Sequence, residues 1–221
     1  MRASKLLTKS DHDRVAAAIE AAESKTSAEV VVCIATRSGR YDRGEDLIGV
    51  VVALLCVAGA WLAFQGAHDE SWGLSLNLGL VPILGIIVVG FSFGAAVATF
   101  FPALSLFFSS RTEMQSNVHD RARIAFQDIG VRGTRAATGV LIYVSLLERT
   151  VSVIGDHGIT EAIDNETWDK LRDTVISGLA KGQASEGLCN AIEKAGAVLA
   201  ESMPGSHDDV DELGNHLRII D

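Results

Sequence analysis

The feature that most constrains this chain is the region of residues 47–108, which is uncharged except for a short polar island at residues 68–70. Its first arm, residues 47–64, is an uncharged run of 18 residues. A helix rises ~1.5 Å per residue, so a run of this length nearly crosses a hydrocarbon core of ~30 Å. The second arm, residues 72–108, is most apolar over residues 76–98. We therefore predict an integral membrane protein with a two-helix transmembrane hairpin.

The end of the second arm has a different composition from the spans. The sequence FFPALSLFF places aromatic side chains around Pro102. Aromatic side chains favour the headgroup boundary of a bilayer, and proline interrupts a helix. We therefore predict an interfacial segment after the second span. Two core helices of a soluble protein are the alternative, but the rest of the chain is too short to enclose them.

The arginines near the hairpin predict its orientation. They flank it on both sides, as Arg37, Arg40, Arg43, Arg111, Arg121 and Arg123. The connection at residues 65–71 contains no lysine or arginine. Because positive residues remain on the cytoplasmic side, we predict a multi-pass protein of the bacterial inner (cell) membrane with both termini and the soluble domain in the cytoplasm.

The net charge of −9 excludes one class of partner and suggests another. An acidic chain is repelled by nucleic acid, so we expect no nucleic-acid partner. Much of the negative charge lies in an acidic arm at residues 206–221. This arm offers a surface to a basic protein. The predicted partners are the lipid bilayer and a membrane protein.

The sequence before the hairpin predicts a helix and a strand. Ser10 is placed to cap an amphipathic helix that ends near Ser24. The following AEVVVCIAT, residues 28–36, is rich in β-branched residues and apolar on both faces. This pattern is typical of a central strand that helices cover on both sides.

The sequence after the hairpin predicts three helices and a β-hairpin. Residues 111–129 have helical periodicity, and Gly130 follows as a C-terminal cap. Residues 139–147 and the alternating TVSVIG that follows predict two strands joined by a short turn, residues 147–150. Asn165 and Ser185 are placed to cap the last two helices. The terminal LRII is either a short docked edge strand or a disordered end.

These elements predict one α/β domain rather than two domains. A single strand at residues 28–36 cannot stand alone, so it pairs with strands that follow the hairpin. The predicted fold is a helix-sandwiched β-sheet interrupted by the transmembrane hairpin. Its parts are residues 1–46 and 109–205 for the two portions of the domain, residues 47–108 for the hairpin and its interfacial segment, and the acidic arm.

Three stretches carry a resemblance to a known family. They are KTSAEVVVCIATRSGRYD, AFQDIGVRGTRAATGVLIYVSLLERTVSVIGDHGI and the W-x-x-L helix with the capped helix after it. Together they resemble the TPM domain, and TGVLIYVSLLERTV is the most specific part. The family includes a plant thylakoid-lumen protein of photosystem II repair, a nematode acetylcholine-receptor accessory protein and many bacterial membrane proteins. The resemblance implies a sheet between helices, and the inserted hairpin resembles a bacterial membrane subgroup.

One loop contains the candidate residues for chemistry. Asp156 and His157 follow a predicted strand, where an adjacent carboxylate and imidazole can share a proton or bind a divalent cation. Glu148 and Glu161 are candidates for further oxygen ligands. The alternative is structural, with Asp156 capping a turn and His157 in solvent. The sequence contains no HExxH or P-loop motif, and no cysteine pair with zinc spacing.

Small residues recur within the two spans. Gly90 and Gly94 form a GxxxG pair, and Gly49 with Ala53 form a similar pair. Such pairs allow helices to approach closely in a bilayer. The two spans therefore either pack on each other or pair with the helix of another protein.

Three functions are compatible with these patterns. The first is a non-enzymatic accessory or regulatory factor for a membrane complex. The second is a membrane-bound, metal-assisted phosphate-ester hydrolase, because a plant member of the family has been proposed to be an acid phosphatase. The third is a sensor of the membrane surface that uses the FFPALSLFF segment. Loss of a defined phosphatase activity in Asp156→Ala distinguishes the second from the first.

Overall fold

The computed structural model describes residues 2–65, 79–131, 138–205, 213–214 and 216–221. The chain divides into two compact units. One, the α/β unit, is formed by Met1–Gly39 and Thr112–Asp221. The other, the hairpin unit, is formed by Arg40–Arg111. Segments on both sides of the hairpin unit therefore build one compact unit.

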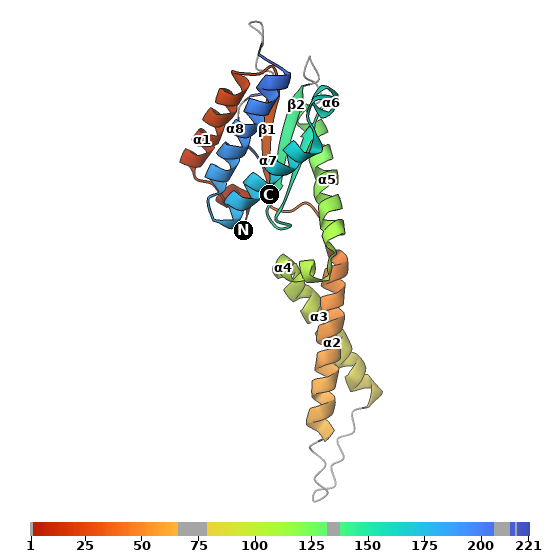
Figure 1. Cartoon of the computed structure of the whole chain (residues 1–221). Helices are drawn as coiled ribbons and strands as arrows, with labels where there is room; N and C mark the ends of the chain where they lie inside the picture. The colour runs from red at the N-terminus through yellow and green to blue at the C-terminus, as the bar shows by residue number, and fades with distance from the viewer. Residues whose placement is uncertain (1, 66–78, 132–137, 206–212, 215) are drawn as a thin grey trace, which may run out of the picture. The chain divides into compact units, whose positions relative to one another are not determined.

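The α/β unit contains ten described helices and strands (Figure 1). They are η1 Ala3–Lys5, α1 Lys9–Glu23, β1 Glu29–Ala35, α5 Arg111–Asp128, β2 Gly139–Ser145, β3 Thr150–Gly155, α6 His157–Ala162, α7 Asn165–Ala180, α8 Ala184–Ser202 and β4 Arg218–Ile220.

The four strands form a mixed sheet in the order β3-β2-β1-β4. β1 is parallel to β2, with Val32 opposite Ile142, and parallel to β4, with Ile34 opposite Ile219. β2 and β3 form the antiparallel hairpin that the sequence predicted. The prediction that the first strand pairs with strands after the membrane hairpin is confirmed. The terminal LRII is the docked edge strand of the two alternatives.

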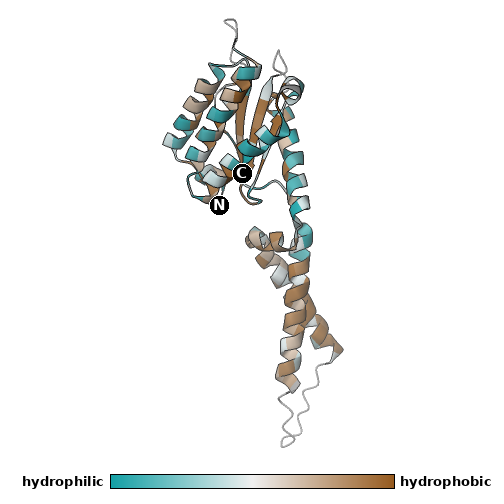
Figure 2. Cartoon of the chain, viewed as in Figure 1, coloured by the Kyte–Doolittle hydropathy of each residue, from teal (hydrophilic) through white to brown (hydrophobic). Residues whose placement is uncertain are grey.

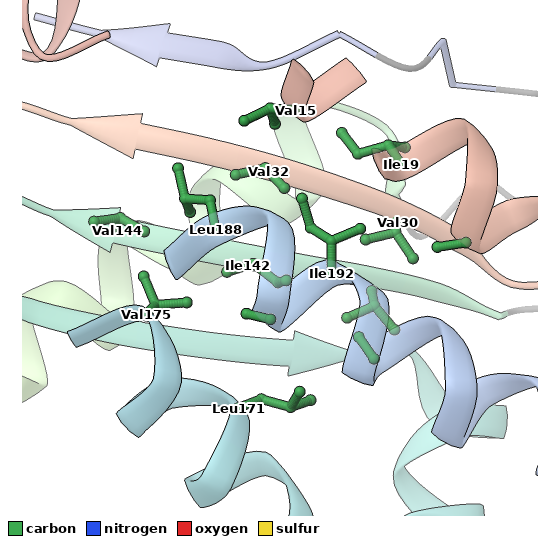
Figure 3. Packing of buried hydrophobic residues seen from close by; sticks show 14 of the residues in the cluster. Val15, Ile19, Val30, Val32, Ile142, Val144, Leu171, Val175, Leu188 and Ile192 are labelled. Carbon is green, nitrogen blue, oxygen red and sulfur yellow. The ribbon is translucent and has the colours of Figure 1, made fainter. Parts of the chain in front are cut away.

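Helices cover both faces of the sheet, as the alternation of side chains requires. On one face, α1, α7 and α8 pack on Val30 and Val32 of β1 and on Ile142 of β2 (Figure 3). On the other face, α5 packs through Val118, Ala122, Ala125 and Phe126. Every residue of β1 and β2 is buried, so the predicted helix-sandwiched α/β fold is confirmed.

Two predicted helix starts are wrong by one or two residues. α1 is capped by Thr8 rather than Ser10, because Thr8 and Asp11 form a reciprocal capping box. α7 is capped by Asp164 rather than Asn165, and the Asp164 carboxylate accepts the N–H of Thr167 at 2.8 Å. In both cases several capping residues lie side by side, and the choice between them depends on the turn that packing allows.

Two further boundaries differ from the prediction and one agrees with it. α8 follows Gln183, which makes no side-chain cap, so Ser185 is not the capping residue. The turn of the β-hairpin is at residues 146–149, one residue earlier than predicted, because β2 ends at Ser145. The predicted capping role of Gly130 is confirmed, since its φ of +83° is a conformation that favours glycine.

The hairpin unit is helical throughout its described residues. It consists of α2 Asp42–Gln65, α3 Leu80–Phe100, α4 Pro102–Ser105 and η2 Leu106–Phe108. α2 begins five residues before the uncharged run, because Asp42 and Glu45 suit the positive end of a helix. α2 and α3 are each long and apolar enough to cross a membrane, and both are strongly hydrophobic in Figure 2.

The small residues of α2 and α3 face each other. A Cβ added to Gly94 would lie 2.9 Å from the Cα of Gly49 and 2.9 Å from the Cβ of Val52. A Cβ added to Gly90 would lie 2.9 Å from the Cα of Ala53. Real Cβ atoms do not approach so closely, so this crossing needs glycine. Of the two alternatives for the small pairs, the structure shows that the spans pack on each other.

Candidate functional site

The sheet brings polar groups to two opposite edges. β1, β2 and β4 are parallel, so their carboxyl ends meet at one edge, where Ala35 lies opposite both Ser145 and Ile220. We call this the carboxyl edge. β3 runs the other way and ends at the opposite edge, where Gly155 pairs with Val140. Ligands of α/β sheets commonly bind beyond the carboxyl ends of parallel strands.

Asp156 and His157 lie at the opposite edge. The segment predicted as a loop is instead the start of α6, for which Asp156 is the N-cap. The backbone N–H of Asp156 donates to the carbonyl of Gly139 at 2.8 Å, and Asp156 Oδ1 accepts the N–H of His157 at 2.7 Å. Asp156 Oδ2 is buried and has no hydrogen-bond partner within the part of the chain that the structure describes.

The structure does not bring the four predicted site residues together. Glu148 lies in the turn before β3 and Asp156 follows the end of β3, so six extended residues separate them, about 20 Å. The side chain of Glu161 lies outside the described residues. Within the described ranges, no group of three His, Cys, Asp or Glu side chains could hold a metal ion. Glu148 and Asp156 therefore do not share one site.

Glu148 instead forms a buried network at the carboxyl edge. Its Oε1 accepts the backbone N–H groups of Ser38 and Gly39, each at 2.9 Å. Its Oε2 accepts the hydroxyl of Ser145 at 2.5 Å. The Ser38 hydroxyl donates to Ser145 Oγ at 2.7 Å and lies 3.2 Å from the hydroxyl of Tyr143. Glu148, Ser145 and Tyr143 are all buried.

Two consecutive N–H groups aimed at one oxygen form an anion-binding concavity, and here the chain's own carboxylate fills it. The Glu148 network joins the end of β1 to the turn after β2, at residues 146–149. Burial raises the pKa of Tyr143 above its ordinary value, so this hydroxyl remains protonated. The arrangement holds Ser38 and Gly39, the last residues before the hairpin unit, in a fixed conformation. These properties are those of a structural site.

One residue of this network is a candidate from the sequence alone. Glu148 follows the predicted strand at residues 139–147, and the sequence predicts it as a metal ligand rather than as the centre of a hydrogen-bond network. Its partners Ser38 and Gly39 are 110 and 109 residues away in the chain. No pattern within a short stretch of the sequence predicts that these residues meet Glu148.

A second network at the carboxyl edge joins both ends of the chain to β1. The Thr36 hydroxyl accepts the N–H of Ala3 at 2.8 Å and donates to Asp221 Oδ1 at 2.9 Å. Asp221 Oδ1 also accepts the N–H of Ser4 at 3.1 Å. The hydrogen bonds from Ser4 and then from Thr36 lower the pKa of Asp221. This network fixes β4 and η1 against the end of β1.

Two grooves lie on the surface of the residues that the structure describes. One, between α7 and α8, is polar, has a volume of about 660 Å³ and is bordered by Lys170, Lys181 and Lys194. Lys170 already pairs with Glu166 at 2.9 Å, and Lys194 donates to Thr174 at 3.2 Å. The other groove lies between the diverging ends of α2 and α3, has a volume of about 680 Å³ and is apolar.

Comparison with known proteins shows what this domain resembles. A family model of the TPM domain matches residues 106–198, which include α5, β2, β3, α6, α7 and most of α8. This part of the chain is therefore similar to the TPM domain. The matched region contains both Glu148 and Asp156, so the family match covers the two acidic residues at the opposite sheet edges.

A solved structure supports the same fold. It is the NMR structure of the BA42 protein from the psychrophilic bacterium Bizionia argentinensis, which is 23% identical to this chain with a TM-score of 0.58. The similarity covers 96% of this chain and 94% of BA42. At this identity the likeness concerns the fold alone. The search of curated proteins found no match.

Proposed function

We propose that this protein is anchored in a membrane by the α2–α3 hairpin and acts as a non-enzymatic accessory or regulatory factor for a membrane complex. The observation that carries the proposal is the outward-facing apolar surface of the hairpin. Leu54, Leu55 and Leu62 of α2 are each about two-thirds exposed, as are Val88 and Val89 of α3. Outward-facing apolar side chains along two long helices are stable in lipid or against another membrane protein, and not in water.

The Glu148 network supports an accessory role over a catalytic one. A catalytic carboxylate needs an oxygen that can reach a substrate or a metal ion. Both oxygens of Glu148 accept hydrogen bonds from the chain itself, and the side chain is buried. The most elaborate polar site at the carboxyl edge is therefore occupied by the protein's own groups.

The proposed compartment is the cytoplasmic side of a bacterial inner membrane. This topology rests on the arginines that flank the hairpin and on their absence between residues 65 and 71. Reporters fused at Gly66 and at the C-terminus test it. Opposite activities at the two positions, with the C-terminal reporter active in the cytoplasm, support the topology. A periplasmic C-terminal reporter contradicts it.

The accessory role is tested by purification of the tagged full chain in mild detergent followed by mass spectrometry. We expect a stoichiometric membrane protein that survives washing. The matched variant neutralises the acidic arm by replacing Asp208, Asp209, Asp211 and Glu212 with their amides. This variant keeps β4, whose removal would open the edge of β1. Loss of the partner in the variant assigns the contact to the arm, and the absence of any partner contradicts the accessory role.

The alternative is a membrane-bound, metal-assisted phosphate-ester hydrolase. The observation that favours it is Asp156 Oδ2, a buried carboxylate oxygen without a described partner. Asp156→Asn is the sharpest variant, because asparagine preserves a helix cap while it removes the charge. A saturable, metal-dependent phosphatase activity that Asp156→Asn abolishes supports the hydrolase. Inactivity of the folded wild-type chain with a range of phosphoesters and divalent ions excludes it.

A further inference from the structure

A cluster of aromatic and aliphatic side chains projects from the hairpin unit where α3 ends. It consists of Phe100, Phe101, Leu104, Phe107 and Phe108, and we call it the aromatic shelf. Phe107 is 91% exposed and Phe100 81% exposed. Residues 99–110 contain no charged side chain. An exposed apolar surface of this kind marks a contact with lipid or protein.

Contacts with α2 hold the aromatic shelf in a fixed position. Ser105 of α4 packs directly on Gly44 of α2, where an added Cβ would overlap the carbonyl oxygen of Ser105. The Ser105 side chain is 1% exposed. The Thr99 hydroxyl donates to Glu45 Oε2 at 3.0 Å, which joins the end of α3 to the first turns of α2. These contacts fix α4 against the start of α2.

Those contacts also fix the depth of the shelf. α2 changes from charged to uncharged between Asp46 and Leu47, two residues beyond Gly44. Ser105 packs on Gly44, so the shelf lies beside the point where α2 would enter the hydrocarbon core. Aromatic side chains concentrate at this depth in membrane proteins, at the boundary between headgroups and acyl chains.

The charges near the shelf indicate how it would bind. Apart from the island at residues 68–70, the charged residues of the hairpin unit are three arginines and three carboxylates, namely Arg40, Arg43, Arg111, Asp42, Glu45 and Asp46. The two signs balance, so this end of the hairpin has no net charge to attract anionic lipid. The long arginine side chains can still reach headgroup phosphates from this depth. Attachment through the shelf therefore depends on partition of its apolar side chains.

We propose that the aromatic shelf is a fixed interfacial anchor that inserts into the headgroup–acyl boundary of a phospholipid bilayer. The occupant of this surface is lipid, since the shelf continues the outward-facing apolar surface of α3 at the end where α2 becomes charged. The inference rests on the proposed membrane insertion of α2 and α3. It adds a second, shallower contact that sets how deeply the hairpin sits.

The test uses single-tryptophan variants of the full chain in lipid nanodiscs. The three native tryptophans, Trp61, Trp72 and Trp168, are replaced by phenylalanine except for the one under study. Trp61 alone reports on the α2 span, and Trp168 alone reports on the α/β unit. Phe107→Trp without the native tryptophans reports on the shelf. Each variant is measured in lipids brominated near the headgroup and in lipids brominated near the chain end.

The proposal predicts that Phe107→Trp loses most of its fluorescence with shallow bromines and little with deep bromines. Trp61 is expected to be quenched by deeper bromines, and Trp168 by neither. Quenching of Phe107→Trp is expected to be unchanged by salt and by the fraction of anionic lipid. A second change, Gly44→Leu, should unseat α4 and remove the depth preference, whereas Gly59→Leu, which has open space around it, should preserve it.

The outcomes separate this inference from the proposed function. Quenching of Trp61 without quenching of Phe107→Trp overturns the lipid anchor and leaves membrane insertion intact. In that case the shelf faces water or a protein partner. If neither Trp61 nor Phe107→Trp is quenched, membrane insertion itself fails. A strong dependence of Phe107→Trp quenching on anionic lipid would overturn attachment by apolar partition.

Discussion

The two units of this chain place the same kinds of side chain in opposite surroundings. In the α/β unit, Leu188 and Ile192 of α8 are fully buried against the sheet. In the hairpin unit, Leu54 and Leu62 of α2 are 64% exposed. A row of large apolar side chains is mostly buried where water is the solvent, and it is stable facing outward where lipid or another protein replaces water. The comparison therefore indicates the environment of each unit.

The units also use different means to bring their elements together. In the α/β unit, branched side chains from three helices interdigitate over the strands, as Figure 3 shows for Val15, Val175 and Leu188. In the hairpin unit, Gly49 and Gly94 allow two backbones to meet. Burial from water gives no advantage between two helices already in lipid, so close van der Waals contact is the main source of stability there.

The largest expected effect comes from a matched pair of leucine substitutions. Leu188→Ala should lower the free energy of unfolding of the α/β unit by about 2–5 kcal/mol, because it leaves a cavity in a fully packed core. Leu54→Ala should change the same quantity by less than about 0.5 kcal/mol. Urea unfolding of the full chain in micelles, followed by circular dichroism, measures both. Equal losses would contradict the separation of the units.

Glu148→Ala is expected to destabilise the α/β unit by about 2–4 kcal/mol. The substitution leaves the N–H groups of Ser38 and Gly39 and the hydroxyl of Ser145 without their acceptor in a buried site. Glu148→Gln should cost less, since its amide oxygen still accepts hydrogen bonds. Exposed Glu186→Ala is the control. A Glu148→Ala protein as stable as the control would mean that solvent replaces the lost acceptor.

Gly94→Leu should separate α2 from α3 without unfolding the α/β unit. A side chain at this position overlaps Gly49 and Val52, and such overpacking costs about 1–3 kcal/mol. Gly85→Leu is the matched control, because a Cβ there meets nothing within 4 Å. Pulsed electron paramagnetic resonance between labels at Cys56 and an engineered cysteine at Leu84, with Cys33 and Cys189 replaced by alanine, measures the separation. An unchanged distance in Gly94→Leu would show that the crossing does not depend on glycine.

Acid titration gives the smallest expected effect. Hydrogen bonds from the Thr8 hydroxyl, the Thr8 N–H and the Ser185 hydroxyl lower the pKa of Asp11 from 3.8 to about 2. Because the folded pKa lies below the ordinary value, Asp11 stabilises the fold fully above its ordinary pKa. This contribution disappears as the pH falls through about 2. Asp11→Asn should therefore destabilise at pH 7 and progressively less as the pH falls toward 2, whereas Asp13→Asn should have little effect at either pH.

Much of the fold could be predicted because its signals are local. The uncharged runs indicated α2 and α3, and continuous β-branched residues at residues 28–36 indicated a central strand. The small pairs at Gly49 and Gly94 indicated close packing, but two partners remained possible until the helices were placed. Helix starts were less certain, because Thr8, Ser10 and Asp11 are all capping residues within one turn.

The polar sites were harder to predict, because they depend on contacts between distant parts of the chain. The proximity of Asp156, His157, Glu148 and Glu161 in sequence suggested one metal site. An antiparallel β3 carries Glu148 and Asp156 to opposite edges of the sheet. The fold instead gives Glu148 its partners from the end of β1, on the other side of the hairpin in sequence. Whether Asp156 takes part in chemistry is still a prediction.

The central claim is that the hairpin lies in a membrane while the α/β unit lies in water. Labelling of the three native cysteines in open membrane fragments with a charged maleimide tests it directly. Cys33 is buried and burial raises its pKa to about 12, so it should not react. Cys189 is partly exposed and should react slowly. Cys56 is exposed on α2, so lipid or a membrane-protein partner must protect it. The account predicts an adduct on Cys189 alone, and all three adducts after denaturation. Rapid labelling of Cys56 in native membranes would contradict it.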